Sequence, residues 1–331
     1  MATLRFDGGE IPCTGDTTVL DALLEAEQPV AFSCKTGMCL TCLLQATEGS
    51  VPEKSQKGVK DTLTAQGYFL PCVCIPEEDL ELASPNDADL FSRAVVTGKE
   101  MLSPNICRIV MEPATPLYYR AGQFLNLRRD DGLMRSYSLA SVPHLDRQLE
   151  FHIKRLPRGK MSNWICDELA TGDSLDIQGP NGPCFYLPDR KQGNMLLIGN
   201  GSGLAPLIGI ARDALHTGHA GDIHLYHGSR HVTGTYLHGE LLELESEFVN
   251  FHYAPCLSRD EPPAGYRAGR AEVTAIADFP DLKDWRVYLC GYPPMVKSAR
   301  QKSYLAGAAM GDIYADPFDL RDLRTEPRKE E

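Results

Sequence analysis

Cys34-Lys-Thr-Gly-Met-Cys39-Leu-Thr-Cys42 is the most informative stretch of this chain, and Cys72, in Phe-Leu-Pro-Cys72, completes it. Three cysteines in C-x4-C-x2-C spacing can be brought to one point by a tight loop, whose backbone N–H groups can face the sulfurs. Gly37 suits such a loop because a left-handed backbone costs glycine little. We therefore expect a metal centre with Cys34, Cys39, Cys42 and Cys72 as its ligands.

The spacing matches the ligand pattern of plant-type [2Fe–2S] clusters. Zinc is the competing interpretation, because Cys39-x2-Cys42 alone could be half of a zinc site. Zinc sites usually pair two C-x2-C units, and Cys72-x-Cys74 is a poor second unit. The sequence therefore favours iron–sulfur and excludes Cys74 from the ligands. Leu40 departs from the usual pattern, which has a small residue there, and predicts a bulkier or more shielded loop.

Composition narrows the class of protein. A chain of 331 residues with 43% hydrophobic residues is long enough for two or three globular domains. Eleven cysteines, an odd number, without a signal sequence predict a reducing cytoplasm rather than a disulfide framework. The longest apolar runs, residues 195–198 and 204–210, are too short to span a bilayer, so we expect no membrane partner.

The net charge of −12 is unevenly distributed. Residues 1–84 hold thirteen acidic and five basic side chains. Such a surface repels nucleic acid and predicts docking to a basic patch on an electron acceptor. The alternative is that the acidity only keeps the protein in solution.

Three patterns follow one another along the chain, and they predict a multidomain α+β protein. Residues 1–84 combine a hairpin, a helix from residue 19 capped by Thr17 or Thr18, and the cysteine loop, which resembles the β-grasp ferredoxin fold. Its predicted strands cover residues 3–6, 10–13, 42–46 and 80–82.

The second pattern, over residues 88–188, follows a linker at 84–87 and predicts a closed antiparallel β-barrel with a helix at 162–169. Its predicted strands cover residues 94–97, 106–111, 124–127, 133–139, 149–156 and 174–178. The third, over residues 194–331, alternates strands and helices, as in an α/β domain with a parallel sheet. Its strands are expected at 195–198, 223–226, 249–254 and 287–289, and its helices at 204–215, 234–247 and 293–306.

Two motifs of the barrel region carry a family resemblance. Arg135-Ser-Tyr137-Ser138 lies on a predicted strand, and Gly159-Lys-Met-Ser162 opens a helix that Ser162 can cap, with free N–H groups that attract anions. Together they resemble the flavin domain of the ferredoxin–NADP reductase superfamily. The resemblance implies that Arg135 neutralises the flavin pyrophosphate, Tyr137 packs on the flavin and Ser138 lies near its N5.

The same resemblance implies a wider flavin-binding set. It comprises Arg135, Ser136, Tyr137, Ser138, His152, Ile153, Lys154, Gly159, Met161 and Ser162. Residues 151–154 would line the flavin ring by backbone contacts, and His152 and Lys154 could equally be ordinary strand residues. FAD is expected from the domain order, with FMN as the alternative.

A glycine-rich turn opens the third region. Gly199-Asn-Gly201-Ser202-Gly203-Leu-Ala-Pro206 follows a predicted strand and precedes a helix, where glycines let backbone approach a pyrophosphate. It is not G-x-G-x-x-G, because leucine occupies the last glycine position. The Cys290-Gly291 pair resembles the segment where the superfamily places the nicotinamide, which makes Cys290 the candidate catalytic residue. Cys290 could instead be a small core residue.

The C-terminal aromatic and the adenosine site complete the predicted set. Phe318, in Asp316-Pro-Phe318, resembles the aromatic that closes over the flavin in this superfamily. Ser258-Arg259 resembles the pair that some members use for NADPH, whereas Asp260 and Glu261 could hold Arg259 away or repel a phosphate. We expect NADH, with NADPH possible.

The domain order resembles the reductase component of multicomponent oxygenases, including aromatic-ring dioxygenases. NADH supplies two electrons as hydride and a [2Fe–2S] cluster accepts one, so a flavin is expected between them. The expected partner is a terminal oxygenase or an intermediary ferredoxin. Two alternatives stay open: a reductase for a sugar dehydratase of the CDP-6-deoxyglucoseen type, and a flavin and iron–sulfur redox sensor.

Overall fold

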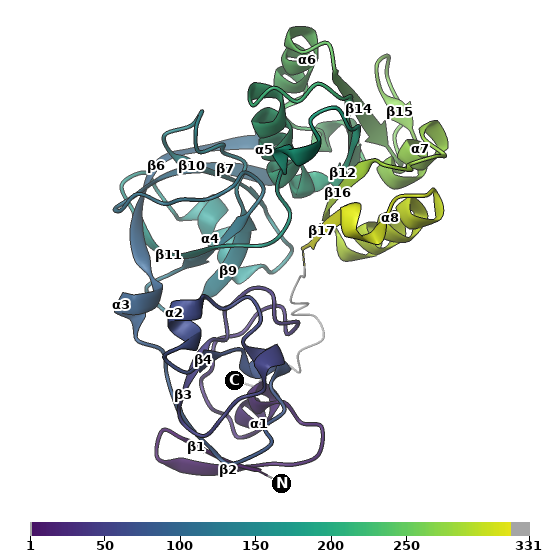
Figure 1. The fold of residues 1–331 in the computed structure, drawn as a ribbon. Helices are drawn as coiled ribbons and strands as arrows, with labels where there is room; N and C mark the ends of the chain where they lie inside the picture. The colour runs from purple at the N-terminus through teal and green to yellow at the C-terminus, as the bar shows by residue number, and fades with distance from the viewer. Residues whose placement is uncertain (1, 319–331) are drawn as a thin grey trace. The chain divides into compact units, whose positions relative to one another are not determined.

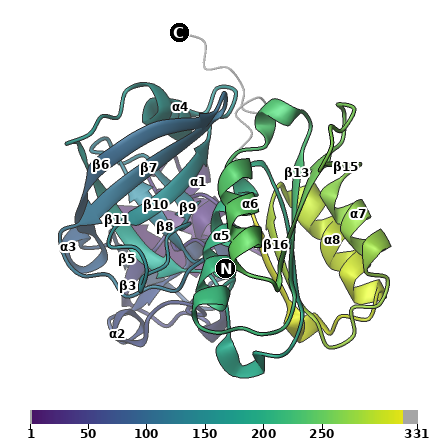
Figure 2. The same ribbon diagram turned by 90° about the horizontal axis from the view of Figure 1, so that it is seen from above.

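The computed structural model describes residues 2–318 and contains three β-sheets (Figures 1 and 2). Their contacts group the chain into two compact units. The first unit holds residues 1–92, 126–136 and 175–181, and the second holds 93–125, 137–174 and 182–331. No helix among the described residues is long and apolar enough to cross a membrane.

The first sheet has the strand order β2-β1-β5-β3-β4. Its strands are β1 (Ala2–Phe6), β2 (Gly9–Cys13), β3 (Leu44–Glu48), β4 (Tyr68–Phe69) and β5 (Leu80–Ala83). β1 pairs antiparallel with β2 and parallel with β5, as a β-grasp fold requires. Helix α1 (Val19–Glu25) is capped by Thr18, whose hydroxyl accepts from the N–H of Asp21, and its apolar face is buried in the same core. The predicted ferredoxin fold is confirmed.

The differences in this region concern short elements. β3 begins two residues later than predicted, because Cys42 still belongs to the cysteine loop. Four short helices were not predicted: η1 (Glu53–Ser55), α2 (Asp61–Thr64), η2 (Pro71–Val73) and α3 (Asp87–Leu90). Segments of three or four residues show no hydrophobic period, so the sequence offers little signal for them.

The second sheet has the order β10-β7-β6-β11-β8-β9. Its strands are β6 (Ser92–Ser103), β7 (Ile106–Pro113), β8 (Phe124–Arg128), β9 (Met134–Ser138), β10 (Leu149–Lys154) and β11 (Ser174–Asn181). The pairings of β7 with β6 and with β10 are antiparallel, as predicted. β6 is much longer than expected, because bulges after Val96 and Met101 keep it paired through a polar stretch.

One prediction about the barrel helix is wrong. Helix α4 (Lys160–Asp167) begins two residues earlier than expected, and its N-cap is Gly159, not Ser162. Ser162 is buried within the first turn, and its hydroxyl accepts from the N–H of Leu156 at 3.2 Å. Serine therefore ties the preceding loop to the helix instead of capping it.

The third sheet is parallel, with the order β15-β14-β13-β12-β16-β17. Its strands are β12 (Met195–Asn200), β13 (Ile223–Ser229), β14 (Phe251–Leu257), β15 (Arg267–Ala268), β16 (Arg286–Gly291) and β17 (Ile313–Pro317). Helices α5 (Leu204–His216) and α6 (His238–Glu247) pack on one face, and α7 (Ala271–Asp278) and α8 (Pro293–Leu305) on the other (Figure 2). The predicted parallel sheet is confirmed, whereas α7, β15 and β17 were missed.

Successive side chains of β12 point to opposite faces of the sheet, and each face is covered by one layer of helices. Met195 and Leu197 pack in the core with α5, and Leu196 and Ile198 pack in the core with α7 and α8. All four side chains are buried, which is why this strand appears in the sequence as an uninterrupted apolar run. The glycine-rich turn follows the carboxyl end of this central strand.

Candidate functional site

The four predicted cysteine ligands lie together in the first unit. Hydrogen bonds join their sulfurs in two pairs, Cys34 with Cys39 and Cys42 with Cys72. The thiol of Cys39 donates to Cys34 and lowers the pKa of Cys34 to about 4, and the bond from Cys42 likewise lowers the pKa of Cys72. The N–H of Thr36 donates to the Cys34 sulfur at 3.4 Å. Cys34 and Cys72 are thereby stabilised as thiolates, whereas the same two hydrogen bonds raise the pKa of the donors, Cys39 and Cys42. Four converging cysteine sulfurs are the donor set that a [2Fe–2S] cluster needs.

The backbone of this loop is left-handed at three places. Gly37 has φ +79°, and a Cβ there would press on Val73, so the expected use of glycine is confirmed. Lys35 and Leu40 have φ +54° and +56°. A leucine in this conformation is uncommon, and Leu40 is half-buried against the core of the first unit. Its packing therefore holds a strained backbone beside Cys39.

Cys74 has a different environment from the four. It is fully buried, and burial raises the pKa of its thiol to about 11. Its carbonyl accepts from the N–H of Val19 at 2.8 Å, which ties it to the start of α1. Its thiol therefore stays protonated and belongs to the core.

Asn126 of β8 contacts the cysteine loop within the first unit, and no motif in the sequence indicates this contact. Its side-chain Nδ2 donates to the carbonyl oxygen of Cys39 and to Oε1 of Gln178, both at 2.7 Å. Its Oδ1 accepts from the hydroxyl of Ser136 at 2.7 Å. Asn126 is fully buried, so all of its hydrogen bonds are made inside the protein.

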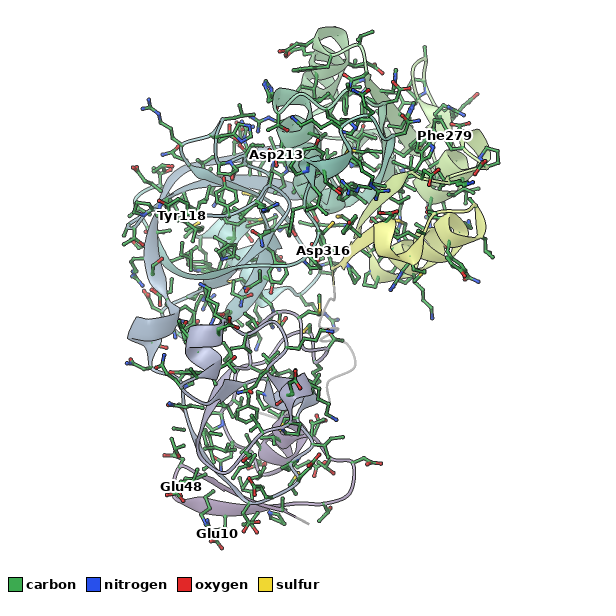
Figure 3. The ribbon with its side chains drawn as sticks, viewed as in Figure 1. Glu10, Glu48, Tyr118, Asp213, Phe279 and Asp316 are labelled. Atoms are coloured by element: carbon green, nitrogen blue, oxygen red, sulfur yellow. The ribbon has the colours of Figure 1, made fainter. Side chains whose placement is uncertain are left out.

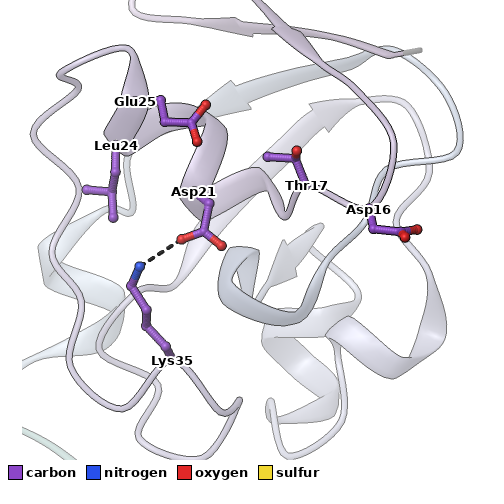
Figure 4. Close-up of a pocket in the computed structure, with 6 residues that line it drawn as sticks. All are labelled: Asp16, Thr17, Asp21, Leu24, Glu25 and Lys35. Carbon is purple, nitrogen blue, oxygen red and sulfur yellow. Dashed lines mark hydrogen bonds and ion pairs between the residues drawn. The ribbon is translucent and has the colours of Figure 1, made fainter.

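A small acidic hollow lies beside the loop (Figure 4). It is lined by Asp16, Thr17, Asp21, Leu24, Glu25 and Lys35. Lys35, the residue after Cys34, donates to Asp21 at 2.7 Å and lowers the pKa of that carboxyl. The hollow keeps a negative balance at neutral pH.

The predicted flavin strand is β9. Arg135, Ser136 and Tyr137 are half-buried, and Arg135 donates to the carbonyl of Met134 at 2.7 Å. On α4, Met161 and Ser162 are buried, so only the backbone there can reach a ligand.

Strand β10 lies against the glycine-rich turn in the second unit. His152 is buried, and its ring nitrogens contact Glu150 at 2.8 Å and the Tyr236 hydroxyl at 3.3 Å. The ring of Tyr236 meets the ring of His227 edge-on, and His227 contacts the carbonyl of Gly201 at 3.3 Å. Burial lowers the pKa of His227 to about 4, so it is neutral. His152 thus has no ring nitrogen free for a cofactor, and Ile153 beside it is buried.

Lys154 brings positive charge to the same turn. Its Nζ lies 3.4 Å from the position that a Cβ at Gly201 would occupy. The surrounding protein partly desolvates the amino group of Lys154, and this desolvation, followed by the charge of Arg230, lowers its pKa. A cation beside a glycine turn suits a phosphate-bearing ligand.

The glycine turn is packed directly on the second nucleotide motif. A Cβ at Gly203 would collide with the carbonyl oxygen of Cys290, and one at Gly291 would collide with Oδ1 of Asn200. Asn200 Oδ1 also accepts from the N–H of Tyr292 at 2.9 Å. Glycine is therefore required for the close approach of the β12–α5 turn to the end of β16, where parallel sheets bind ligands.

Cys290 itself is fully buried, and its sulfur lies 3.7 Å from that of Cys184. Burial, with this contact, raises the pKa of the Cys290 thiol well above its usual value. The thiol is therefore neutral and is no acid or base near pH 7.

The C-terminal strand joins three predicted residues. In β17, Asp316, which is labelled in Figure 3, lies opposite Cys290 in the register. Its carboxylate accepts from the hydroxyl of Ser138 at 3.0 Å. The N–H of Phe318 donates to the carbonyl of Gly291 at 2.7 Å. Ser138, Gly291 and Phe318 are thereby brought to one place.

At the predicted adenosine site, one expectation is wrong. Asp260 does not hold Arg259 away; its carboxylate accepts from His231 at 2.7 Å and from the N–H of Val232 at 2.9 Å. Ser258 and Arg259 are exposed, and the N–H of each donates to the carbonyl of a residue at the end of β13, Ser229 and Arg230 respectively. Within residues 2–318, the Arg259 side chain forms no ion pair.

Comparison with known families identifies three domains, in the order predicted from the sequence. Residues 5–77 match the 2Fe-2S iron-sulfur cluster binding domain, residues 93–186 the oxidoreductase FAD-binding domain, and residues 197–301 the oxidoreductase NAD-binding domain. The chain thus has the domains for a [2Fe–2S] cluster, FAD and NAD.

Similar proteins share the whole arrangement. The reductase subunit of an aromatic O-demethylase from an Amycolatopsis species is 36% identical over 88% of this chain and 90% of its own length. The ferredoxin–NAD(P)(+) reductase component of the naphthalene 1,2-dioxygenase and salicylate 5-hydroxylase systems of a Ralstonia species is 32% identical over 91% of this chain and 93% of its own. The crystal structure of the Amycolatopsis cytochrome P450 reductase GcoB superposes with a TM-score of 0.69 at 32% identity, covering 96% of this chain and 99% of that one. From its three domains and these relatives, the chain belongs to the ferredoxin–NADP reductase superfamily, among the oxygenase reductase components with an N-terminal [2Fe–2S] ferredoxin domain.

Proposed function

We propose that this protein takes electrons from NADH and delivers them singly to a terminal oxygenase, or to a ferredoxin that serves one. The observation that carries the proposal is the four-sulfur site on the same chain as a glycine turn packed against Cys290. The named systems of the relatives, including dioxygenases and a demethylase, point to an oxygenase as partner. The bound cofactors would supply hydride acceptance and single-electron transfer.

The residues of this chain bind and orient those groups. Cys34, Cys39, Cys42 and Cys72 would hold the cluster. Arg135 and Lys154 would offset phosphate charge, and the turn Gly199–Gly203 would approach the pyrophosphate of NADH by backbone alone. Since Cys290 is buried and neutral, we propose that it shapes the nicotinamide site by its size, without transferring a proton.

Supply of the purified holoprotein and NADH to purified candidate oxygenases tests the function. Product formation that depends on this protein would support it. If the protein and NADH support turnover of a sugar dehydratase but of no oxygenase, the function is that of a sugar dehydratase reductase. NADH oxidation too slow to support any acceptor, artificial ones included, would favour the redox sensor.

Flavin retention gives a prediction about Arg135. Removing its guanidinium deletes a charged hydrogen bond to the flavin phosphates, so Arg135→Ala should weaken FAD binding by ~1.5–3 kcal/mol. Equilibrium dialysis with flavin fluorescence measures the change. Arg129→Ala is the matched control, because Arg129 pairs with the exposed Asp131. Equal loss in both variants would contradict the assignment, and release of FMN on heating would contradict FAD.

Nucleotide preference gives a second prediction. The Asp260 carboxylate, held by His231 beside Ser258-Arg259, should disfavour a 2′-phosphate, so kcat/KM should be higher for NADH than for NADPH. Arg259→Ala should lower kcat/KM for NADPH more than for NADH. Both values are measured at one salt concentration. A clear NADPH advantage that Arg259→Ala abolishes would show that the arginine sets the preference.

The acidic hollow beside the loop suits docking. Asp16, Asp21 and Glu25 present carboxylates near Lys35, the residue that follows Cys34, and a basic patch on the acceptor would complement them.

We also propose that the protein is cytoplasmic and that its domains span residues 1–84, 88–188 and 194–331. Cell fractionation tests the first, and limited proteolysis tests the second.

A further inference from the structure

Three metal-ligating side chains gather in the second unit, at the amino ends of β13 and β14. Asp222 precedes β13, His224 lies on β13, and His252 lies directly opposite on β14. Their ligand atoms all lie within 4.8 Å of one another, and His252 Nε2 is 3.7 Å from Asp222 Oδ1. The proposed function uses none of the three.

We propose that Asp222, His224 and His252 form a binding site for a divalent transition-metal ion of the zinc or nickel type. Two imidazoles and one carboxylate are ligands that such ions prefer over the all-oxygen sets of magnesium and calcium. Three protein ligands leave a further position for water.

The backbone around the site is already held in place. His224 and His252 are register partners in the sheet, which fixes the spacing of their Cα atoms. The N–H of Asp222 donates to Oδ1 of Asn194 at 3.1 Å, and its carbonyl accepts from the N–H of Met195 at 2.8 Å. Only side-chain rotations are therefore needed to bring in the ligand atoms, which a tetrahedral zinc ion requires roughly 3.4 Å apart.

The two rings show which side chain moves. They stack with centroids 4.5 Å apart and planes 20° from parallel, so one ring must turn for both to face a single ion. His224 is wedged against Phe279 and Trp285, with centroids at 4.4 and 5.8 Å (Figure 3 labels Phe279). His252 is 43% exposed and Asp222 is 54% exposed, so these two can adjust.

The charge balance favours a cation. With neutral imidazoles, Asp222 leaves the group with one negative charge. The nearby Asp278 is occupied, since it accepts from the Tyr226 hydroxyl at 2.6 Å and from Arg267 at 2.7 Å. Asp222 is therefore the carboxylate that would bind the ion.

The site is distant from the cofactor chemistry. β13 has seven residues, which at ~3.3 Å each put its amino end about 20 Å from the carboxyl end where the nucleotide would bind. Metal binding should thus join β13, β14 and the preceding turn without changing NADH oxidation.

Calorimetric titration of the untagged holoprotein, with cluster and flavin loaded, tests the site using Zn²⁺, Ni²⁺ and Mg²⁺ separately. We expect one saturable equivalent of Zn²⁺ or Ni²⁺ and none of Mg²⁺. His252→Asn and Asp222→Asn should each weaken Zn²⁺ binding at least roughly tenfold. His144→Asn is the matched control, because His144 pairs with Asp213 at 3.7 Å without a second histidine.

A second readout is the fluorescence of Trp285, one of two tryptophans in the chain. Bound Ni²⁺ should quench this fluorescence, because the Trp285 ring lies close to the His224 ring that would bind the ion. His252→Asn should abolish this quenching. Unchanged Zn²⁺ affinity in both His252→Asn and Asp222→Asn, or the absence of saturable binding in the parent protein, would overturn the proposal.

Discussion

Cys72→Ser should abolish the visible absorption and the paramagnetic signal of the cluster while FAD stays bound. Cys72 shares a hydrogen bond with Cys42 in the four-sulfur group, and a serine oxygen is a poor substitute for its thiolate. Transfer of electrons to the terminal acceptor should be lost almost completely. Ferricyanide reduction by NADH should persist, because ferricyanide can take electrons from the flavin.

Cys74→Ser is the matched control for this result. Cys74 is only two residues away and is equally a buried cysteine, but it packs in the core with a protonated thiol. This variant should lose some stability and keep the cluster signal. A cluster that survives in Cys72→Ser and disappears in Cys74→Ser would show that the fourth ligand is Cys74.

Gly203→Ala should have the second largest effect. Its new Cβ would collide with the carbonyl oxygen of Cys290, which is backbone and cannot rotate away. The turn and the end of β16 must then separate, at a cost of about 1–3 kcal/mol of stability, as for other overpacked sites. We expect a large rise in KM for NADH and a lower Tm, measured by steady-state kinetics and calorimetry.

Gly239→Ala separates this effect from a general response to alanine. Gly239 is in α6, where an added Cβ meets no atom within 4 Å, and alanine favours the helix. The control should keep KM and gain slightly in Tm. A Gly203→Ala protein with parental KM would mean that the close packing of the turn on Cys290 is not needed for nucleotide binding.

The sequence predicted elements with strong local patterns well. The stripe of α1, the apolar run of β12 and the C-x4-C-x2-C loop each carry their own signal, and all three appear in the structure. The elements it missed have weak patterns, such as β17, a strand of only five residues at the edge of the sheet that ends in Asp316-Pro317. The predicted N-cap of α4 was wrong because the Ser162 hydroxyl accepts a hydrogen bond from the N–H of Leu156 instead, and no spacing rule indicates this contact.

The site was predictable where chemistry is concentrated in a short motif. The cysteines and the glycine turn are such motifs. Asn126, Tyr236 and Cys184 could not be found, because each acts through a contact with a residue far away in sequence. A single asparagine in a strand or a single cysteine before a phenylalanine has no local signature. Only the fold shows that these side chains touch the predicted residues.

The hydrogen bond from Asn126 to the Cys39 carbonyl has a consequence for protein engineering. In the sequence, the ferredoxin region ends near residue 84 and could be exchanged as a module for that of a relative. A grafted module whose loop carbonyl lies elsewhere would leave the buried Asn126 amide without one acceptor, at roughly 1–3 kcal/mol. The useful crossover is therefore a set of three exchanges made together: residues 1–92, the β8–β9 segment 126–136, and β11 residues 175–181. Chimeras made at the linker alone would inherit a mismatch at position 126, remote in sequence from the joint.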